Sequence, residues 1–371
     1  MSLRISALAV VVLGAGCVNG DVDEPETQDV HQDIQSCDIF LCGTNSPQIA
    51  ELGFWELNLP SPRAPGLANN AGFRVVGFVQ NNLLFLPKVS GGKLTASRTS
   101  TVWPYLTTTL SGNALIGGYL YLTNGSRAFA IMVNEVNPVD SWAQQLGAPH
   151  VTLESYRLDW TELVNQVPGR FQNVCKNPPI REPSDLLGMV GQNAFHTLLF
   201  EGDRIDAAKK LDTAIDTSWF NLGCAGSALA KLALTGHTEA AANANTFVTT
   251  LPERQAMLKM FAGDYCGDGT PFTVAGQPLN WADDHGTMQL TALQMQPPQP
   301  LLLEARWTEN GAACLDTPRV DAHPTTLSDQ VFGPDVYDRV QNHCPAQMPP
   351  PCADHSFGTG GYHLVTATVP L

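Results

Sequence analysis

The sequence predicts an α+β protein in which an N-terminal antiparallel β domain, of sandwich or barrel-like form, precedes a disulfide-stapled α+β domain. Short apolar or alternating runs, separated by clusters of Gly, Asn, Ser and Pro, predict the first domain. A change to helical spacing in the second half predicts the second domain. Nine cysteines in a chain that begins like an exported protein predict the disulfides.

Residues 1–16 resemble a secretory signal. Arg4 precedes an apolar run from Ile5 to Leu13, which is shorter than the about 20 residues that a spanning helix needs. The ending LGAGC resembles the lipobox of bacterial lipoproteins, in which Cys17 is lipidated; the alternative is a plain signal with cleavage nearby. We therefore expect an exported protein, either an outer-membrane or periplasmic lipoprotein or a secreted one.

The stretch 18–36 holds six acidic residues, no basic one and almost no large apolar side chain, so we expect 17–44 to be a disordered tether. If Cys17 carries lipid, eight cysteines remain, an even number that fits four disulfides of open connectivity. The eight expected disulfide cysteines are Cys37, Cys42, Cys175, Cys224, Cys266, Cys314, Cys344 and Cys352.

The net charge is −15, from 20 basic and 35 acidic residues. We found no basic stripe, which argues against nucleic acid and disfavours anionic lipid surfaces, because binding to either depends on Lys and Arg. Past the signal there is no second membrane segment. We therefore expect contact with a membrane only through the lipid anchor, and an unidentified protein or glycan partner. No cofactor or metal is expected.

Residues 45–166 form the expected β domain, with no triad-like set and one histidine, His150. Its expected strands lie in 72–79, 81–89, 113–123, 129–136 and 151–160. Trp103 and Trp142 could belong to a binding face, although burial in the core is the commoner fate of tryptophan. The breaker-rich stretch 167–185, which contains Cys175, is the expected linker.

Residues 186–345 form the expected α+β domain, and 346–371 a proline-rich tail with a terminal strand in 361–371. The expected helices are 221–236 with Asn221 as N-cap, 251–263 with Pro252 in its first turn and Gly263 at its end, and 334–344. The expected strand pairs are 271–276 with 277–283, and 301–307 with 313–318.

The stretch FAGDYCGDGTPFT, residues 261–273, is the most site-like part of the chain. As a calcium loop it places Asp264, Cys266, Asp268 and Gly269 at the first, third, fifth and sixth positions. The pattern fails twice, because Cys266 has sulfur where an oxygen ligand is needed and Ala275 stands where a glutamate is needed. As a nucleophile, Cys266 could work with His285 and Asp283 or Asp284, but a helix C-terminus and two aspartates disfavour a thiolate. The third hypothesis is a disulfide-pinned turn.

Two further patterns carry alternatives. His343, Cys344, Cys352 and His355 have a loose zinc-like spacing, but disulfide bonding of the two cysteines is the commoner outcome in an exported chain. Asp268, Asp283 and Asp284 could supply an acidic pair for hydrolysis, but short acidic side chains are more often turn formers.

MFAGDYCGDGTPFTVAGQPLNWAD and the later LEARWTENGAACLDTPR resemble the ADYC domain family, and WFNLGCAGSALAKLALTGH resembles the helix that precedes its motif. The resemblance covers about Trp219 to Arg319 and implies an exported bacterial protein, often myxobacterial, without an assigned activity. Gly263 replaces the usual alanine of the motif.

Family members often carry one further cysteine in each of the two helices, where this chain has Leu232 and Met257 or a neighbour. Their joint absence implies that the family's cysteines pair structurally, and that Cys224, Cys266 and Cys314 do so too. In the turn, the resemblance and the residues together favour Asp264 as a cap, Tyr265 packed inward, and Gly267 and Gly269 at positive φ.

These observations favour a non-enzymatic cell-envelope lipoprotein with a binding or structural role. No residue is assigned as catalytic. The first alternative is an extracytoplasmic hydrolase that uses Cys266 and His285 or an acidic pair. The second is a carbohydrate-binding surface protein whose β domain presents an exposed aromatic row.

Overall fold

The structure is a computed structural model of the full chain. It describes residues 47–50, 52–142, 152–175, 195–206, 211–238, 249–273, 279–285, 302–322, 335–354 and 364–368. The expected signal, the expected lipidation site Cys17 and the expected tether lie outside these residues, as do Cys37, Cys42, His150, Ala275 and His355. Among the described residues, no helix is both long enough and apolar enough to span a membrane.

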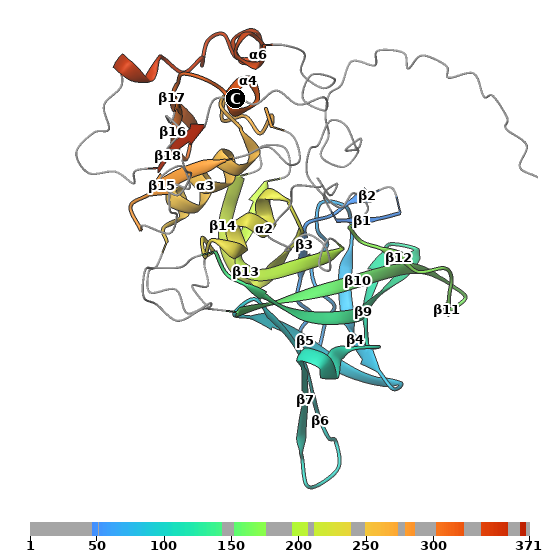
Figure 1. The fold of residues 1–371 in the computed structure, drawn as a ribbon. Coiled ribbons are helices and arrows are strands. Elements are labelled where there is room, and N and C mark those ends of the chain that lie inside the picture. Colours follow the sequence, from blue (N-terminus) through green and yellow to red (C-terminus); the bar gives the residue numbers. More distant parts are fainter. Residues whose placement is uncertain are drawn as a thin grey trace, which may run out of the picture. The chain divides into compact units, whose positions relative to one another are not determined.

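Most of the described structure is antiparallel β-sheet, and the largest sheet has twelve strands (Figure 1). They are β3 (Glu56–Asn58), β4 (Arg74–Gln80), β5 (Leu83–Ser90), β6 (Lys93–Thr99), β7 (Thr107–Ser111), β8 (Tyr119–Asn124), β9 (Arg127–Asp140), β10 (Thr152–Val164), β11 (Val167–Pro168), β12 (Gln172–Asn173), β13 (His196–Asp206) and β14 (Leu211–Cys224). The main path is β3-β14-β13-β10-β9-β8-β4-β5-β6-β7, and β11 and β12 pair with β10. A separate two-stranded sheet joins β1 (Gln48–Ile49) to β2 (Leu52–Gly53).

The expected antiparallel β architecture is confirmed, but the large sheet continues beyond residue 166. β11 and β12 lie in the expected linker, and β13 and β14 lie in the expected α+β domain, yet all four belong to this sheet. The reason is long-range pairing, since β13 bonds to β10 on one side and β14 on the other. The sheet therefore extends to Cys224.

The sheet folds back so that β5 and β6 meet β10 and β13 across a core. Tyr156 of β10 accepts a hydrogen bond from the backbone of Leu94 in β6 at 2.8 Å. Glu201 of β13 accepts hydrogen bonds from the turn glycines Gly91 and Gly92, the first at 2.6 Å. The core between them is rich in Phe, Leu and Val side chains from β4 to β14.

The second part combines helices with a four-stranded antiparallel sheet of order β15-β18-β16-β17. Its elements are α2 (Ala228–Leu234), α3 (Leu251–Ala262), β15 (Asn280–Asp283), β16 (Leu302–Thr308), β17 (Gly311–Leu315), α4 (Arg319–Ala322), α6 (Val336–His343) and β18 (Leu364–Thr368). The short 3₁₀ segments are η2 (Gly112–Leu115) and η4 (Cys352–Asp354). A buried bidentate ion pair joins α3 to the large sheet, with Arg254 Nε 2.7 Å from Asp203 Oδ2 of β13.

Local signals predicted α3, the β16–β17 hairpin, α6 and the terminal strand correctly. Thr250 and Glu253 form a capping box around Pro252, and Gly263 ends α3 at φ 65°. One expectation was wrong. Asn221 lies in β14 and α2 begins only after its N-cap Ser227, because β14 is paired on both sides. The strand at 280–283 pairs with β18, and its expected partner 271–276 is described only as far as Thr273, where it is not a strand.

Three disulfides are present among the described cysteines. Cys175 bonds to Cys224, which attaches the expected linker to the end of β14. In the second part, Cys266 bonds to Cys344 and Cys314 bonds to Cys352. Disulfide stapling of this part is therefore confirmed, and Cys344 and Cys352 each bond elsewhere instead of to one another.

Candidate functional site

The turn after α3 is built around a buried lysine. The Lys259 ammonium donates to Asp264 Oδ2 at 3.3 Å and to the carbonyl oxygen of Gly267 at 2.8 Å. The same carboxylate oxygen accepts the N–H of Gly269 at 2.9 Å. Both ionic side chains are fully buried. The turn therefore contains its own cation, which occupies the carboxylate that a calcium ion would need.

The disulfide removes the thiol on which the nucleophile hypothesis depends. Cys266 and Cys344 are joined at an S–S distance of 2.00 Å, and the neighbouring His343 Nε2 lies 2.7 Å from Asp268 Oδ2. Gly267, at φ 77°, lies so close to Asn310 that an added Cβ would be 2.1 Å from its carbonyl oxygen. These contacts hold the turn against α6 and the β16–β17 hairpin. They favour a structural role for Cys266 over the role of a nucleophile.

Tyr265 completes a buried polar group beneath the turn. Its hydroxyl donates to Glu304 Oε1 at 2.6 Å, and Arg319 Nε donates to the same oxygen at 2.7 Å. The tyrosine ring stacks on Trp307 at a centroid distance of 5.3 Å. Burial raises the pKa of Tyr265 well above its ordinary value, so the phenol stays protonated. The motif residues thus connect α3, β16 and α4.

The two helix positions without a cysteine lie in one core. Leu232 of α2 and Met257 of α3 are both fully buried in the same hydrophobic cluster, and the two helices pack together. Both positions therefore contribute apolar side chains to the core on which α2 and α3 pack.

Asp283 and His285, the other catalytic candidates, lie beside residues that the sequence did not suggest. His237 Nε2 is 3.5 Å from Asp283 Oδ2, and His285 Nε2 is 3.7 Å from Glu253 Oε1. The two imidazole rings are 6.0 Å apart. Burial is the main reason that the pKa of His237 falls to about 4, although Asp283 acts in the opposite direction. In the described ranges, no three His, Cys, Asp or Glu side chains form a metal site.

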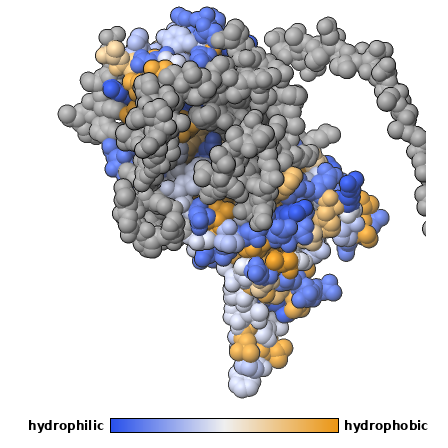
Figure 2. All heavy atoms as spheres, in the orientation of Figure 1, coloured by the Kyte–Doolittle hydropathy of each residue, from blue (hydrophilic) through white to orange (hydrophobic). Residues whose placement is uncertain are grey.

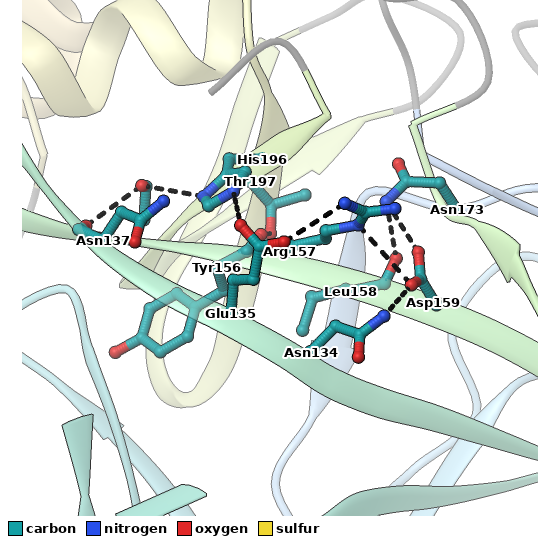
Figure 3. A network of polar contacts seen from close by, with 11 residues as sticks. Asn134, Glu135, Asn137, Tyr156, Arg157, Leu158, Asp159, Asn173, His196 and Thr197 are labelled. Atoms are coloured by element: carbon teal, nitrogen blue, oxygen red, sulfur yellow. Dashed lines mark hydrogen bonds and ion pairs between the residues drawn. The ribbon is translucent and has the colours of Figure 1, made fainter. Parts of the chain in front are cut away.

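A second polar network lies on the large sheet, where His196 of β13 faces β9 and β10 (Figure 3). Its Nδ1 is 3.0 Å from Ser155 Oγ, and its Nε2 is 3.4 Å from Glu135 Oε2. The order Ser, His, Glu is that of a catalytic triad, and sequence analysis missed it because strand pairing alone brings these residues together.

The geometry of this network is structural rather than nucleophilic. Ser155 Oγ lies 3.1 Å from the carbonyl oxygen of Asn137, an acceptor that competes with His196 for the single hydroxyl proton. Both Ser155 and His196 are only 2% exposed, which keeps a substrate from the hydroxyl oxygen. Arg157 extends the network to Glu135 at 3.2 Å and to Asp159 at 3.6 Å. The network therefore ties β9, β10 and β13 together.

The most unusual surface is the end of the β6–β7 hairpin, which we call the hairpin tip (residues 100–106). Its four large apolar side chains are all exposed: Val102 by 71%, Trp103 by 79%, Tyr105 by 67% and Leu106 by 67%. Figure 2 shows hydrophobic atoms at the end of this hairpin, next to a pale, weakly polar stem. Full burial of such side chains stabilises a protein by roughly 1.5–3 kcal/mol each. The exposed side chains of the hairpin tip do not contribute this stabilisation.

The expected burial of Trp103 is therefore wrong, whereas Trp142 is partly buried against the second core. Hydrogen bonds close the hairpin tip, since Ser100 N–H donates to the carbonyl oxygen of Leu106 at 2.8 Å and Leu106 N–H to that of Pro104 at 2.7 Å. The backbone thus holds the apolar side chains outward without help from a core.

The stem that carries the hairpin tip is polar but uncharged on one face. Ser97 and Thr109 hydroxyls are 3.1 Å apart, and those of Thr99 and Thr107 are 3.0 Å apart. β6 pairs with β5 only as far as Ser97, so its last two residues pair with β7 alone. The hairpin tip therefore extends beyond the edge at which β5 pairs with β6.

The sequence segment that contains the hairpin tip differs in charge from the whole chain. Residues 57–134 contain six basic residues and no acidic one, although the net charge is −15. The six are Arg63, Arg74, Lys88, Lys93, Arg98 and Arg127. This local absence of acid, together with the run VWPYL, is the signal by which the sequence could have indicated the site.

The described residues define a disulfide-stabilised, mostly antiparallel β protein with an exposed apolar hairpin. The family model of the ADYC domain matches residues 112–321, more than half of the chain. The chain therefore belongs to the ADYC domain family. The match begins well upstream of Trp219, and the hairpin tip lies outside it. No curated protein and no solved structure matches the chain.

Proposed function

We propose that this chain is an exported, non-enzymatic binding protein of the cell envelope, and that the hairpin tip is its contact site. The observation that carries the proposal is the exposure of four neighbouring large apolar side chains on one hairpin. Exposed apolar patches of this kind mark contact with a partner or a membrane. The hydrogen-bonded backbone of the hairpin tip supports the same role because it presents these side chains in one arrangement.

Export is supported by the three disulfides, because such bonds persist in oxidising compartments. A lipid on Cys17 would tether the chain at a membrane, as the lipobox-like ending suggests. Its presence would show as an acyl mass on the N-terminal peptide of the exported protein, and an unmodified Cys17 would contradict this part of the proposal.

Hydrolysis has weaker support than binding. The Cys266 sulfur is bonded to Cys344, and Ser155 is buried with its hydroxyl within 3.1 Å of a backbone carbonyl. Carbohydrate binding is the stronger rival, because Trp103 and Tyr105 are exposed aromatic residues. However, a sugar site also needs polar groups that converge on the hydroxyls of the ligand. Apart from the two aromatic residues, the polar side chains in 99–111 are Ser and Thr alone, which makes carbohydrate binding the weaker interpretation.

Co-sedimentation with the envelope fraction of the producing cells tests the contact site. We expect the double variant Trp103→Ser, Tyr105→Ser to lose most of its binding. The matched control is Val164→Ser, Val167→Ser, because these residues are exposed by 65% and 63% beside the β10–β11 turn. Unchanged thermal unfolding would show that both variants fold. Equal binding by the hairpin-tip variant and the wild-type chain would overturn the proposal.

A further inference from the structure

Resting on this proposed function, we infer that the partner of the hairpin tip is a lipid surface: an anionic membrane whose interfacial layer receives Val102, Trp103, Tyr105 and Leu106. The inference has three parts, namely the chemistry of the hairpin tip, the charge behind it, and the length of the stem.

The chemistry of the hairpin tip fits a bilayer interface. It combines aliphatic Val102 and Leu106 with aromatic Trp103 and Tyr105, all more than two-thirds exposed. Trp and Tyr concentrate where one end of the side chain meets hydrocarbon and the other meets water. A glycan would need polar groups that converge on its hydroxyls. The hydroxyls of Thr99, Thr107 and Thr109 are instead engaged in pairs across the stem.

The charge behind the hairpin tip complements anionic headgroups. Arg98 is exposed and lies next to the last residue of β6, so it is the basic residue nearest the hairpin tip. Lys88 and Lys93 are exposed nearer the base of the stem, where Glu201 contacts Gly91 and Gly92, and they do not contribute to this contact. No acidic residue occurs from 57 to 134, so the hairpin itself carries no acid beside Arg98. Anionic membrane surfaces attract basic residues within about a Debye length, near 8–10 Å. The inference thus departs, for this hairpin, from the expectation that the net charge disfavours anionic lipid.

The stem is long enough for shallow insertion. From Thr99 back to Lys93 the strand spans six residue steps, about 20 Å at 3.3 Å per residue. Interfacial segments enter the headgroup region by only about 5–10 Å. The hairpin tip can therefore insert, with Arg98 at headgroup level, while the base of the stem stays in water.

Trp103 provides a direct test, because it is the exposed member of the seven tryptophans. Trp142 is partly buried, and Trp55, Trp160, Trp219, Trp281 and Trp307 are buried. The full chain, carrying Cys17→Ser so that no lipid is attached, is mixed with vesicles of phosphatidylcholine and phosphatidylglycerol in equal parts. We expect a blue shift of Trp103 emission and quenching by lipids brominated in their acyl chains. Trp103→Phe should keep the binding and lose that quenching.

Two matched variants test the contact itself. Val102→Asp should weaken vesicle binding by roughly tenfold or more, because a charge replaces an inserted apolar group. Val164→Asp, at a valine that is 65% exposed elsewhere on the sheet, should leave binding unchanged. Arg98→Gln should weaken binding about fivefold on anionic vesicles and leave vesicles of phosphatidylcholine alone unaffected.

The outcomes separate this inference from the proposed function. If envelope binding depends on the hairpin tip but brominated lipid does not quench Trp103, the contact site stands and the lipid surface is wrong, which leaves a glycan or protein partner. If the emission shift needs no vesicles and grows with protein concentration, the hairpin tip contacts a second copy and the inference is overturned. Quenching that persists in Trp103→Phe would place the lipid at another face and also overturn it.

Discussion

Lys259 and Asp264 form a buried ion pair inside the turn that carries the Asp-Tyr-Cys-Gly-Asp-Gly motif, with Nζ 3.3 Å from Oδ2. Burial raises the pKa of Asp264, while the neighbouring ammonium and the Gly269 amide act in the opposite direction. The pair links the last turn of α3 to the loop that follows it. The turn thus holds a cation, which is a side chain of the protein itself.

Loss of the Asp264 charge should destabilise the protein strongly. Asp264→Asn leaves the Lys259 ammonium buried without its counter-charge, and such losses cost about 3–5 kcal/mol. Asp268→Asn is the matched control, because its side chain is 48% exposed and its loss should cost at most about 1 kcal/mol. Urea unfolding measures both free energies. Equal values for the two variants would contradict a buried pair.

The Cys266–Cys344 bond should be closed and stabilising. Iodoacetamide treatment of the non-reduced protein, followed by peptide mass analysis, should leave all six described cysteines unalkylated. The double variant Cys266→Ser, Cys344→Ser opens a loop of 78 residues, and its unfolding free energy should fall by about 4 kcal/mol. An alkylated Cys266 in the native protein would be incompatible with the disulfide and would revive the hydrolase alternative.

Acid should destabilise the fold through His237. Its folded pKa is about 4, below the ordinary value near 6.5, so the unfolded chain binds a proton first as the pH falls. The stability that the neutral His237 imidazole contributes is fully present above pH 6.5. On the order of 3 kcal/mol of unfolding free energy is lost as the pH falls from 6.5 to 4. His237→Gln should flatten this part of the stability–pH curve, and the exposed His343→Gln should not. A flat curve in the wild-type chain would refute the assignment.

Gly267 should tolerate no side chain. At φ 77° an added Cβ would stand 2.1 Å from the Asn310 carbonyl, so Gly267→Ala should cost more than about 3 kcal/mol or prevent folding. Gly125 has a similar φ of 62° with open space around it, so Gly125→Ala should cost about 1–2 kcal/mol for its backbone alone. Thermal unfolding of the two variants separates the cost of backbone strain alone, in Gly125→Ala, from the cost of strain together with a steric clash, in Gly267→Ala. Similar losses would argue against close packing of the turn on the β16–β17 hairpin.

Features set by neighbouring residues were predictable from the sequence. Pro252 and Gly263 bracket α3 because the groups that cap a helix lie within a few residues of its ends. The family motif and the parity of the cysteines predicted a disulfide-pinned turn, and Cys266 lies in one. The start of α2 was misplaced because the Asn221 segment meets two strands distant in sequence, and their pairing overrides local helical spacing.

The sequence by itself determined the antiparallel β character, the family and the turn at residues 261–273, because periodicity and motif spacing are local properties. The tertiary structure alone decided which cysteines pair, that Asp283 meets His237, and that Trp103 is exposed. Exposure depends on which strands cover a residue. β5 ends its pairing at Ser97, so the apolar run that follows β6 extends past the core that would otherwise have buried it.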